Sequence, residues 1–322
     1  MKISIIIVTW NVCDEILTCL HSIEENPPAY KYEVLVVDNS SKDDTVREIR
    51  DNFPGISLII NESNLGFAAA NNIGLLKSQG ELILFLNPDT IIKPNSLDAL
   101  IALMDKNEDI GVCSPKLLNP DGSLQESVRG FPTFRAALHR HTAFKYLYVF
   151  KGMYKKWLMK DQSYEKLADV DQVMGAALIT RKSILELVGP MDEQFFMYYE
   201  EVDLCYRIKK AGWRVVYAPQ SEIIHIGGSS SGQIPAGKRI MALTSLLKFF
   251  KKHRGVYLTC LFSLIFKPAL LIRDIIEMSS SMIKYIYWAV VFNKIERNKS
   301  AKRIKITCEL LSKYSWFSLF KV

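Results

Sequence analysis

The chain has 322 residues, and 41 Lys and Arg against 34 Asp and Glu give it a formal net charge of +7 at pH 7. This length can bury an α/β core of roughly 240 residues and still leave a tail. The six cysteines lack paired metal-binding spacing and no nucleic-acid recognition motif is visible, so a zinc module and a nucleic-acid-binding protein are poor interpretations. No secretory signal precedes the first apolar run, and we expect a reducing, cytosolic setting.

Three apolar runs in the first third of the chain stop abruptly at polar residues. They cover residues 3–8, 33–37 and 82–86, and residues 16–23 have the apolar spacing of an amphipathic helix. Repeated strand and helix units of this kind predict a largely parallel sheet. The carboxyl ends of parallel strands meet at one edge of a sheet, where such sheets bind ligands. We therefore expect five polar residues to converge there: Thr9, Asn11, Asp38, Ser40 and Asp89.

Asp89 comes after the third run, in the proline-stiffened turn Asn87-Pro88-Asp89. A carboxylate at the end of a strand can hold a divalent cation on a nucleotide diphosphate, because such cations prefer oxygen ligands. The alternative is an aspartate that only caps the next turn or helix. The spacing of the residues leaves both interpretations open.

Asp38 begins an Asp-rich turn, and one of Asp38, Ser40 or Asp43 is expected to cap the next turn or helix. Capping does not need all three. The surplus of hydrogen-bonding groups suits recognition of a pyrimidine base and ribose, because a carboxylate can accept the imide N–H. Residues 64–74 are rich in Asn and small residues, which permits either close approach of the backbone to a ligand or close helix packing.

In the second half, residues 202–208 have helical apolar spacing, and Gly212 predicts where that helix ends. Glu200 and Glu201 then lie at its amino terminus. They either suit the positive end of the helix dipole or supply a base that deprotonates an acceptor hydroxyl. Residues 173–177 have small side chains and are expected to form a strand, which either floors an acceptor site or simply packs.

His225 ends a short β-branched run and begins a Gly- and Ser-rich stretch at residues 226–232. A single histidine is more often a structural hydrogen-bonding residue than a ligand. The stretch after it has the composition of a mobile lid over a diphosphate. That composition favours a second interpretation, in which His225 lies close to the diphosphate.

The last seventy residues have a different character. Residues 256–272 are almost wholly apolar but broken by Lys267-Pro268, and a second apolar stretch covers residues 282–292. Neither is an uninterrupted span of about 20 residues. Clusters of Lys and Arg flank both stretches, which predicts association with the cytosolic face of an anionic bilayer. The alternatives are a helical subdomain packed on the core or on a second subunit, as in a homodimer, and a hairpin that inserts with both ends cytosolic.

Four motifs occur in order in the first ninety residues: IIIVTWN, VLVVDNSSKDDT, NLGFAAANNIG and LFLNPDT. Together they resemble family 2 of the inverting glycosyltransferases, which share the GT-A fold. Within that family they look most like the bacterial rhamnosyltransferase branch, which uses a deoxythymidine-diphosphate (dTDP) sugar. The resemblance extends over residues 2–252. It implies an α/β fold with a mixed, largely parallel central sheet, a nucleotide-diphosphate sugar donor, and Mg²⁺ or Mn²⁺ as cofactor.

The resemblance also implies roles for individual residues. Asp38 would recognise the base, Asp89 would bind the metal ion, and His225 would be a further metal ligand. The family usually has two aspartates around one residue, but here Asn87 replaces the first, and an uncharged amide binds Mg²⁺ or Mn²⁺ less strongly. The remaining contacts to the nucleotide sugar would be Thr9, Asn11, Ser40, Asn64, Gly66, Asn71 and Asn87.

The sequence EEVDL resembles the more frequent EDVDL, which marks the catalytic helix of the family. This alignment places Glu201 at the position of the base, with Glu200 as the alternative. Asp203 would orient the acceptor or the helix.

We therefore expect a glycosyltransferase domain at residues 1–252 and an apolar, basic, membrane-associated helical tail at residues 253–322. The expected reaction is inverting transfer of rhamnose from dTDP-rhamnose to a polyprenyl-linked or glycan acceptor in cell-surface polysaccharide synthesis, on the cytoplasmic side of the membrane. Two alternatives remain open. One is a UDP-sugar-dependent hexosyl- or N-acetylhexosaminyltransferase of the same family, and the other is a non-catalytic membrane-bound scaffold.

Overall fold

The computed structural model describes residues 1–227 and 235–313 and divides into two compact units. Unit 1 comprises residues 1–131 and 159–233, and unit 2 comprises residues 132–158 and 234–322. Unit 2 thus includes a segment for which sequence patterns predicted no element. The expected boundary between residues 252 and 253 is a functional one, with catalysis before it and membrane association after it. That functional boundary stays a prediction.

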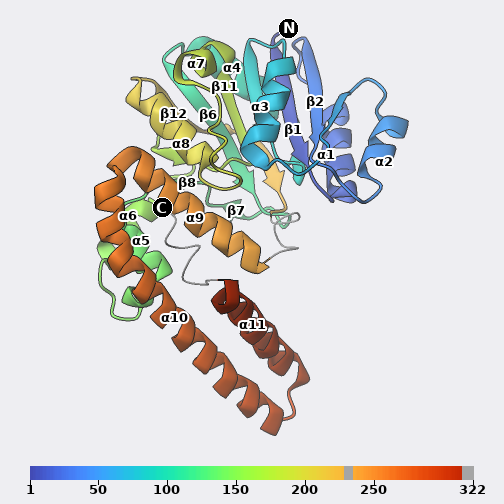
Figure 1. Cartoon of the computed structure of the whole chain (residues 1–322). Helices are drawn as coiled ribbons and strands as arrows, with labels where there is room; N and C mark the ends of the chain where they lie inside the picture. Colours follow the sequence, from blue (N-terminus) through green and yellow to red (C-terminus); the bar gives the residue numbers. More distant parts are fainter. Residues whose placement is uncertain (228–234, 314–322) are drawn as a thin grey trace. The chain divides into compact units, whose positions relative to one another are not determined.

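Unit 1 is built on a ten-stranded sheet (Figure 1). Its strands are β1 (Ile3–Thr9), β2 (Tyr32–Asp38), β3 (Ser57–Ile60), β4 (Leu82–Leu86), β5 (Thr90–Ile92), β6 (Ile110–Leu118), β7 (Leu124–Gln125), β9 (Ala168–Asp169), β11 (Ala177–Arg181) and β12 (Arg214–His225). The main path runs β3-β2-β1-β4-β11-β6-β12-β5. Strands β1 to β4 pair in parallel, β11 is antiparallel to both neighbours, and β12 is parallel to β6. This mixed, largely parallel sheet confirms the expected fold class.

Two short strands pair apart from this sheet, β8 (Val128–Arg129) and β10 (Gln172–Val173). The helices of unit 1 are α1 (Cys13–Glu25), α2 (Thr45–Asn52), α3 (Phe67–Lys77), α4 (Ser96–Lys106), α7 (Lys182–Val188) and α8 (Glu200–Lys210). Ile5 and Ile7 of β1 pack in an apolar cluster with residues of α1 and α4, whereas Ile6 packs in another with residues of α7 and α8. Because side chains alternate along a strand, a strand buried on both faces has a continuous apolar sequence.

The expectation of a strand at residues 173–177 is wrong. β10 ends at Val173, β11 begins at Ala177, and residues 174–176 form a turn between them. The backbone carbonyl of Ala176 accepts a hydrogen bond from the backbone N–H of Asn87 at 2.8 Å. This bond holds the turn against the end of β4. The small side chains of the turn therefore allow its backbone to lie close to the backbone of Asn87.

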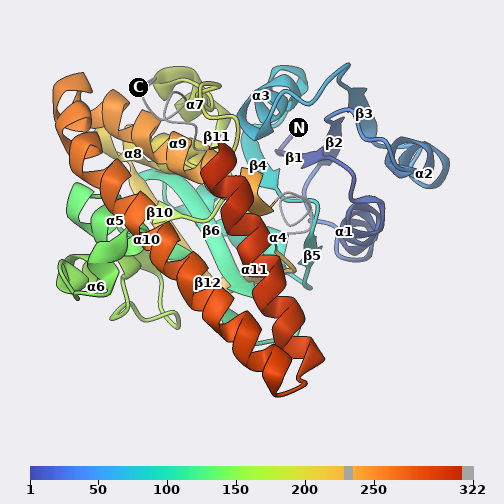
Figure 2. The ribbon, with the colours of Figure 1, turned by 60° about the horizontal axis from the view of Figure 1, so that its bottom comes forward.

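Unit 2 is helical. Its elements are α5 (Phe134–His141), the 3₁₀ helix η1 (Ala143–Lys145), α6 (Lys151–Leu158), α9 (Pro235–Arg254), α10 (Val256–Val290) and α11 (Lys294–Lys313). Figures 1 and 2 show α10 and α11 side by side, running in opposite directions. The ring of Phe134 in α5 lies 4.5 Å from that of Phe250 in α9 and 4.6 Å from that of Phe262 in α10. Aromatic packing therefore joins residues 132–158 to the carboxyl-terminal helices.

The two apolar stretches expected in the tail form one helix of 35 residues, α10. Pro268 lies inside it, although a proline removes one backbone N–H and normally interrupts a helix. Pro268 is itself exposed, while Phe266, Ala269 and Leu270 beside it are buried, and their packing keeps the helix continuous. By length and composition α10 could cross a membrane, a test that the core helices of soluble proteins also pass.

Candidate active site

Thr9 and Asp38 end two neighbouring strands and lie opposite one another in the register of β1 and β2. Asp38 is fully buried, and its Oδ2 accepts a hydrogen bond from the backbone N–H of Ser41 at 3.0 Å. Its Oδ1 and the hydroxyl of Thr9 are buried without a hydrogen-bond partner among the described residues. A buried polar atom without a partner costs about 1–3 kcal/mol. The unpaired Asp38 oxygen therefore fits a ligand that brings an N–H, as the imide of thymine or uracil does.

Asn11 and Ser40 both adopt left-handed backbone conformations, with φ of 52° and 65°. Such strain is often held at functional sites by surrounding contacts. The backbone N–H of Asn11 donates to Ser41 Oγ at 2.9 Å, and its Oδ1 accepts from the backbone N–H of Lys42 at 2.7 Å. Asn11 thus fixes the loop after β2.

Gly66 has a φ of +87°, and a Cβ built on it would lie 2.4 Å from the backbone oxygen of Phe196. The backbone N–H of Phe67 donates to that same oxygen at 2.7 Å, and Asn64 Oδ1 accepts from the N–H of Gly66 at 3.0 Å. Close packing, the second of the two interpretations of this segment, therefore accounts for Gly66. Asn71 differs, because its buried Oδ1 has no hydrogen-bond partner among the described residues.

Asp89 and His225 lie together at the margin of the sheet, where β5 pairs with β12. Both are buried, and Asp89 Oδ1 is 3.4 Å from His225 Nε2. Asn87 Nδ2 lies 3.5 Å from the same nitrogen. Asp89 and His225, which the resemblance assigned to the metal ion, are therefore neighbours of Asn87, which it assigned to the nucleotide sugar.

Gln125 decides which nitrogen of His225 carries hydrogen. Its Nε2 donates to Asn119 Oδ1 at 3.0 Å and to the backbone oxygen of His225 at 3.1 Å, so its Oε1 faces His225 Nδ1, at 2.6 Å. This network assigns a hydrogen to Nδ1 and turns Nε2 toward the carboxylate of Asp89. The lone pair of Nε2 and the carboxylate of Asp89 are both acceptors, so the pair suits a cation placed between them.

Asp89 and His225 therefore fit a divalent cation, with Asn87 as a neutral third group. Among the described residues, no group of three or more His, Cys, Asp or Glu side chains could hold a metal ion. A cation here would have two strong protein ligands and would need further oxygens from a bound diphosphate, an arrangement typical of Mg²⁺ sites.

Glu200 and Glu201 begin α8, as the sequence predicted. The two residues before them, Tyr198 and Tyr199, have left-handed φ values of 69° and 72°. Their backbone sets the direction in which the helix begins. Glu200 is buried, whereas Glu201 is partly exposed, and Oε2 of each has no hydrogen-bond partner among the described residues. Burial raises the pKa of both carboxyls, and the neighbouring charge of Glu201 raises the pKa of Glu200 further, to well above its ordinary value.

These properties favour Glu201 over Glu200 as a base. A base must reach the acceptor hydroxyl and must be ionised at the working pH. Glu201 is the more accessible of the two. A raised pKa also makes its carboxylate a better proton acceptor, provided that it still ionises.

Asp203 lies on the same helix but forms an ion pair with Arg207. It is fully buried, and its Oδ2 accepts from Arg207 Nε at 2.7 Å. Arg207 donates in turn to the backbone oxygens of Val188, Gly189 and Pro190, each at 2.7 Å. Asp203 thus orients the helix against the preceding loop, one of the two roles expected of it.

The turn at residues 174–176 connects the Asn87-Pro88-Asp89 turn to the carboxylates of α8. Ala176 accepts the hydrogen bond from Asn87 described above, and a Cβ added to Gly175 would lie 3.4 Å from Glu201 Cβ and 3.8 Å from its Cδ. Glu201 therefore lies directly beside the backbone that holds the Asn87-Pro88-Asp89 turn. Residues 228–232 of the expected lid lie outside the described residues.

Sequence patterns missed four residues that hold the site: Asn39, Ser41, Gln125 and Phe196. Asn39 links three loops, accepting from Asn61 Nδ2 at 2.9 Å and donating to the oxygen of Gly66 at 3.1 Å. The polar run after β2 included Asn39 and Ser41 and could have drawn attention to them. Gln125 and Phe196 stand in no motif, because their partners are about 100 or more residues away in sequence.

The fold is the GT-A fold. A family model described as Glycosyl transferase family 2 matches residues 4–184. The chain belongs to glycosyltransferase family 2 and is a glycosyltransferase.

Two curated relatives are named rhamnosyltransferases. The N-acetylglucosaminyl-diphospho-decaprenol L-rhamnosyltransferase of Mycobacterium tuberculosis is 31% identical over 216 residues, which cover 63% of this chain and 69% of that protein. The rhamnosyltransferase WbbL of Escherichia coli is 29% identical over 230 residues, which cover 69% of this chain and 82% of that protein.

Solved structures share the fold at low sequence identity. The mannosyltransferase PcManGT of Pyrobaculum calidifontis, in complex with GDP-Man and Mn²⁺, is 17% identical with a TM-score of 0.55, covering 98% of this chain and 87% of that one. GalNAc-T7 with UDP, GalNAc and Mn²⁺ is 18% identical with a TM-score of 0.54, covering 70% of this chain. This chain spans only 43% of the GalNAc-T7 chain.

Proposed function

We propose that this glycosyltransferase moves rhamnose from dTDP-rhamnose, with inversion, to a polyprenyl-linked or glycan acceptor at the cytoplasmic face of the membrane. The names of the mycobacterial and E. coli relatives support the sugar, and the mycobacterial name supports a lipid-linked acceptor. The proposed product is a cell-surface polysaccharide or its precursor.

One observation carries the mechanism: Glu201 lies against Gly175, next to the turn that holds Asn87 and Asp89. In a single displacement, the acceptor hydroxyl attacks the anomeric carbon, its proton passes to Glu201, and the nucleotide diphosphate leaves with the electron pair of the broken bond. A divalent ion held by Asp89 and His225 would stabilise the charge that develops on that diphosphate. Inversion results because attack and departure occur on opposite faces of the sugar.

The proposed recognition of the base can be tested at Asp38. In Asp38→Asn, the amide oxygen can keep the hydrogen bond from Ser41, which leaves the amide nitrogen as a donor toward the base. A donor repels the imide N–H of thymine and uracil but matches the acceptor N3 of cytosine. We expect the variant to lose affinity for dTDP and UDP by more than about tenfold and to gain relative affinity for CDP. An unchanged ranking of the three nucleotides by calorimetry would exclude Asp38 as the residue that recognises the base.

The donor sugar can be tested with a panel of nucleotide sugars in thermal-shift and transfer assays. A ligand at about 100 times its dissociation constant stabilises a protein by roughly 2.7 kcal/mol. The proposal predicts that dTDP-rhamnose gives the largest shift and the fastest transfer. A larger response to UDP-glucose, UDP-galactose or UDP-N-acetylglucosamine would favour the UDP-sugar alternative. A chain that binds no donor and hydrolyses none would be the non-catalytic scaffold.

A further inference from the structure

Charge is divided unequally between the two units. Unit 2 contains 23 of the 41 Lys and Arg but only four of the 34 Asp and Glu. Its formal charge is therefore +19, and the remaining 18 basic and 30 acidic residues give unit 1 a charge of −12. A net charge of +7 for the whole chain hides this separation. A surface this basic attracts an anionic partner.

The outer face of α10 is apolar along its whole length. Ten of the fifteen exposed large apolar residues of α10 have the spacing of one helix face: Tyr257, Leu261, Leu264, Ile265, Ile272, Ile275, Ile276, Ile283, Ile286 and Val290. Between 42% and 75% of the surface of each is exposed. The other five are Val256, Leu258, Met282, Tyr285 and Tyr287. Lys284 is the one charged residue among the exposed positions of this helix.

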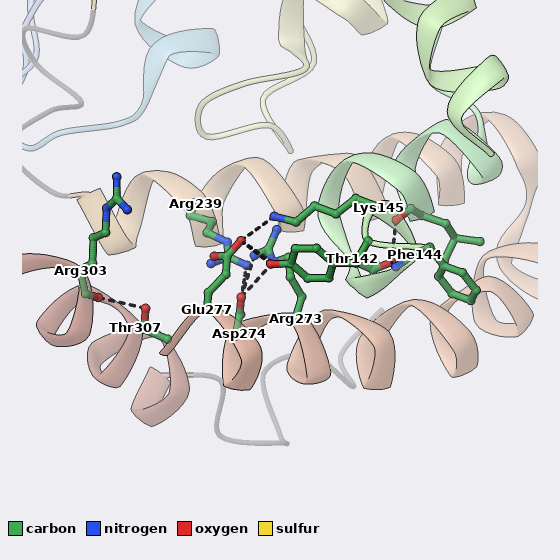
Figure 3. A network of polar contacts seen from close by, with 11 residues as sticks. Thr142, Phe144, Lys145, Arg239, Arg273, Asp274, Glu277, Arg303 and Thr307 are labelled. Carbon is green, nitrogen blue, oxygen red and sulfur yellow. Dashed lines mark hydrogen bonds and ion pairs between the residues drawn. The ribbon is translucent and has the colours of Figure 1, made fainter. Parts of the chain in front are cut away.

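The inner face of α10 contains charged side chains (Figure 3). Asp274 is fully buried, and its Oδ1 accepts from Arg239 of α9 at 2.6 Å and from Arg273 at 2.8 Å. One turn further on, Glu277 Oε1 accepts from Lys145 of η1 at 2.5 Å. These five residues form an ionic cluster that joins α10 to α9 and η1.

This distribution is not that of a water-soluble helix. A helix in water turns its apolar stripe to the core and its charges to solvent. α10 buries apolar residues such as Phe262 and Phe266, but it also buries Arg273 and Asp274 and exposes a second stripe, rich in isoleucine. Ionisable residues that pair with one another inside the protein are typical of elements that face lipid. The outer face of α10 is therefore matched to hydrocarbon.

The charges on the neighbouring helix, α11, indicate how α10 contacts the lipid. α11 packs along α10 and exposes five basic residues: Lys294, Lys299, Lys302, Arg303 and Lys305. If α10 crossed the bilayer, these charges would enter the hydrocarbon with it, at a high cost. A helix of 35 residues is also about 52 Å long, well beyond the roughly 30 Å of a hydrocarbon core.

We propose that α10 lies in the plane of an anionic membrane, with its exposed apolar stripe among the acyl chains and the basic residues of α11 at the level of the headgroups. The ionic cluster faces the protein and holds the helix in this rotation. Because it names the surface that meets the membrane, the inference rests on the proposed membrane-bound acceptor. Vesicle binding needs neither donor nor acceptor, so it can fail or succeed independently of the proposed reaction.

The first experiment measures binding of the full-length chain to vesicles of phosphatidylcholine with 30 mol% phosphatidylglycerol, chosen here as the probe. We expect wild type to bind these vesicles in a salt-sensitive manner. The double variant Ile275→Glu, Ile283→Glu should lower the partition coefficient about tenfold or more, because it places charge in the apolar stripe. The matched control is Leu76→Glu, an equally apolar residue that is 83% exposed on α3. It should bind within about twofold of wild type.

The second experiment measures depth. A fluorophore is attached at Cys260, with Cys13 and Cys308 replaced by serine, or at Ile275→Cys or Ile286→Cys, with Cys260 replaced as well, and its quenching by spin-labelled lipids is measured. We expect all three positions to lie at the same shallow depth, because the helix axis is parallel to the membrane. A label at Cys308 of α11, with Cys13 and Cys260 replaced, should escape quenching by lipids labelled on their acyl chains.

Three results would overturn the inference. The first is wild-type affinity for vesicles in the double glutamate variant, or no vesicle binding by wild type. The second is a depth profile in which residue 275 is deepest and residues 260 and 286 are near opposite surfaces, which describes a spanning helix. The third is a dimer in solution, detected by sedimentation without vesicles, that the glutamate substitutions dissociate. That result would assign the stripe to a second copy of the chain.

Discussion

Replacing Glu201 by glutamine should abolish most transfer and leave donor binding intact. The substitution preserves the shape of a side chain that lies against Gly175 and removes its ability to accept a proton. Loss of a general base typically lowers turnover by 10²- to 10⁴-fold. A 100-fold loss corresponds to about 2.7 kcal/mol of activation free energy. Because the donor contacts lie on other elements, the thermal shift produced by the nucleotide sugar should not change.

The raised pKa of Glu201 predicts how turnover depends on pH. Burial disfavours the ionised carboxylate, so the wild-type rate should increase as the pH rises through this pKa and the base becomes ionised. Glu201→Gln should have a rate that is low and independent of pH over the same range. The rate is measured at saturating donor and acceptor in single-turnover experiments, which separate chemistry from product release.

The matched control is Glu200→Gln on the same helix. Folding raises the pKa of Glu200, so the folded state favours the protonated carboxyl. This preference contributes its full stabilisation of the folded protein at a pH below the unfolded-state pKa. The stabilisation is lost as the pH rises through the folded-state pKa. Glu200→Gln should therefore transfer sugar and be more stable than wild type at pH 8, because glutamine carries no charge for burial and the neighbouring Glu201 carboxylate to disfavour. The difference should vanish at acidic pH. A dead Glu200→Gln variant beside a fully active Glu201→Gln variant would refute the assignment.

Two further substitutions test how the site is held. Gln125→Leu removes the acceptor that orients His225, so the apparent affinity for Mg²⁺ or Mn²⁺ in a metal titration of the transfer rate should fall about 10- to 100-fold; an unchanged titration would exclude this role. Gly66→Ala places a Cβ 2.4 Å from the oxygen of Phe196, whereas a Cβ at Gly122, which has a similar φ of +80°, meets nothing within 4 Å. Gly122→Ala should lose about 1 kcal/mol from backbone strain alone and Gly66→Ala about 3 kcal/mol or more in urea unfolding. Equal losses would show that the contact with Phe196 imposes no constraint.

Helix α8 shows where local sequence is sufficient. Helical spacing from residue 202 and Gly212 at its end predicted α8 and placed Glu200 and Glu201 in its first turn. The two left-handed tyrosines before it could not be predicted, because nothing local to Tyr198 or Tyr199 requires that conformation. Contacts from other elements impose it.

The pair Asp89 and His225 shows the opposite case. Asp89 and His225 could be nominated one by one, but their separation of 3.4 Å depends on the pairing of β5 with β12. The sequence spacing of 136 residues between them contains no information about that register. Gln125 could not be nominated at all, since a single glutamine on a two-residue strand resembles any surface residue.

The order of residues is enough to predict three strands of the sheet and the polar residues at their carboxyl ends. Strands buried on both faces must be continuously apolar, and a buried strand must end where polar groups begin, so β1, β2 and β4 and the residues that end them are visible in the residue order. The packing of residues 132–158 with the carboxyl-terminal helices, and the neutralisation of acids on α10 by Arg239 and Lys145, became visible only in three dimensions. An apolar helix with charges at intervals is compatible with either rotation about its axis. The rotation is fixed by partners that are distant in the chain, whose positions depend on the packing of the whole unit.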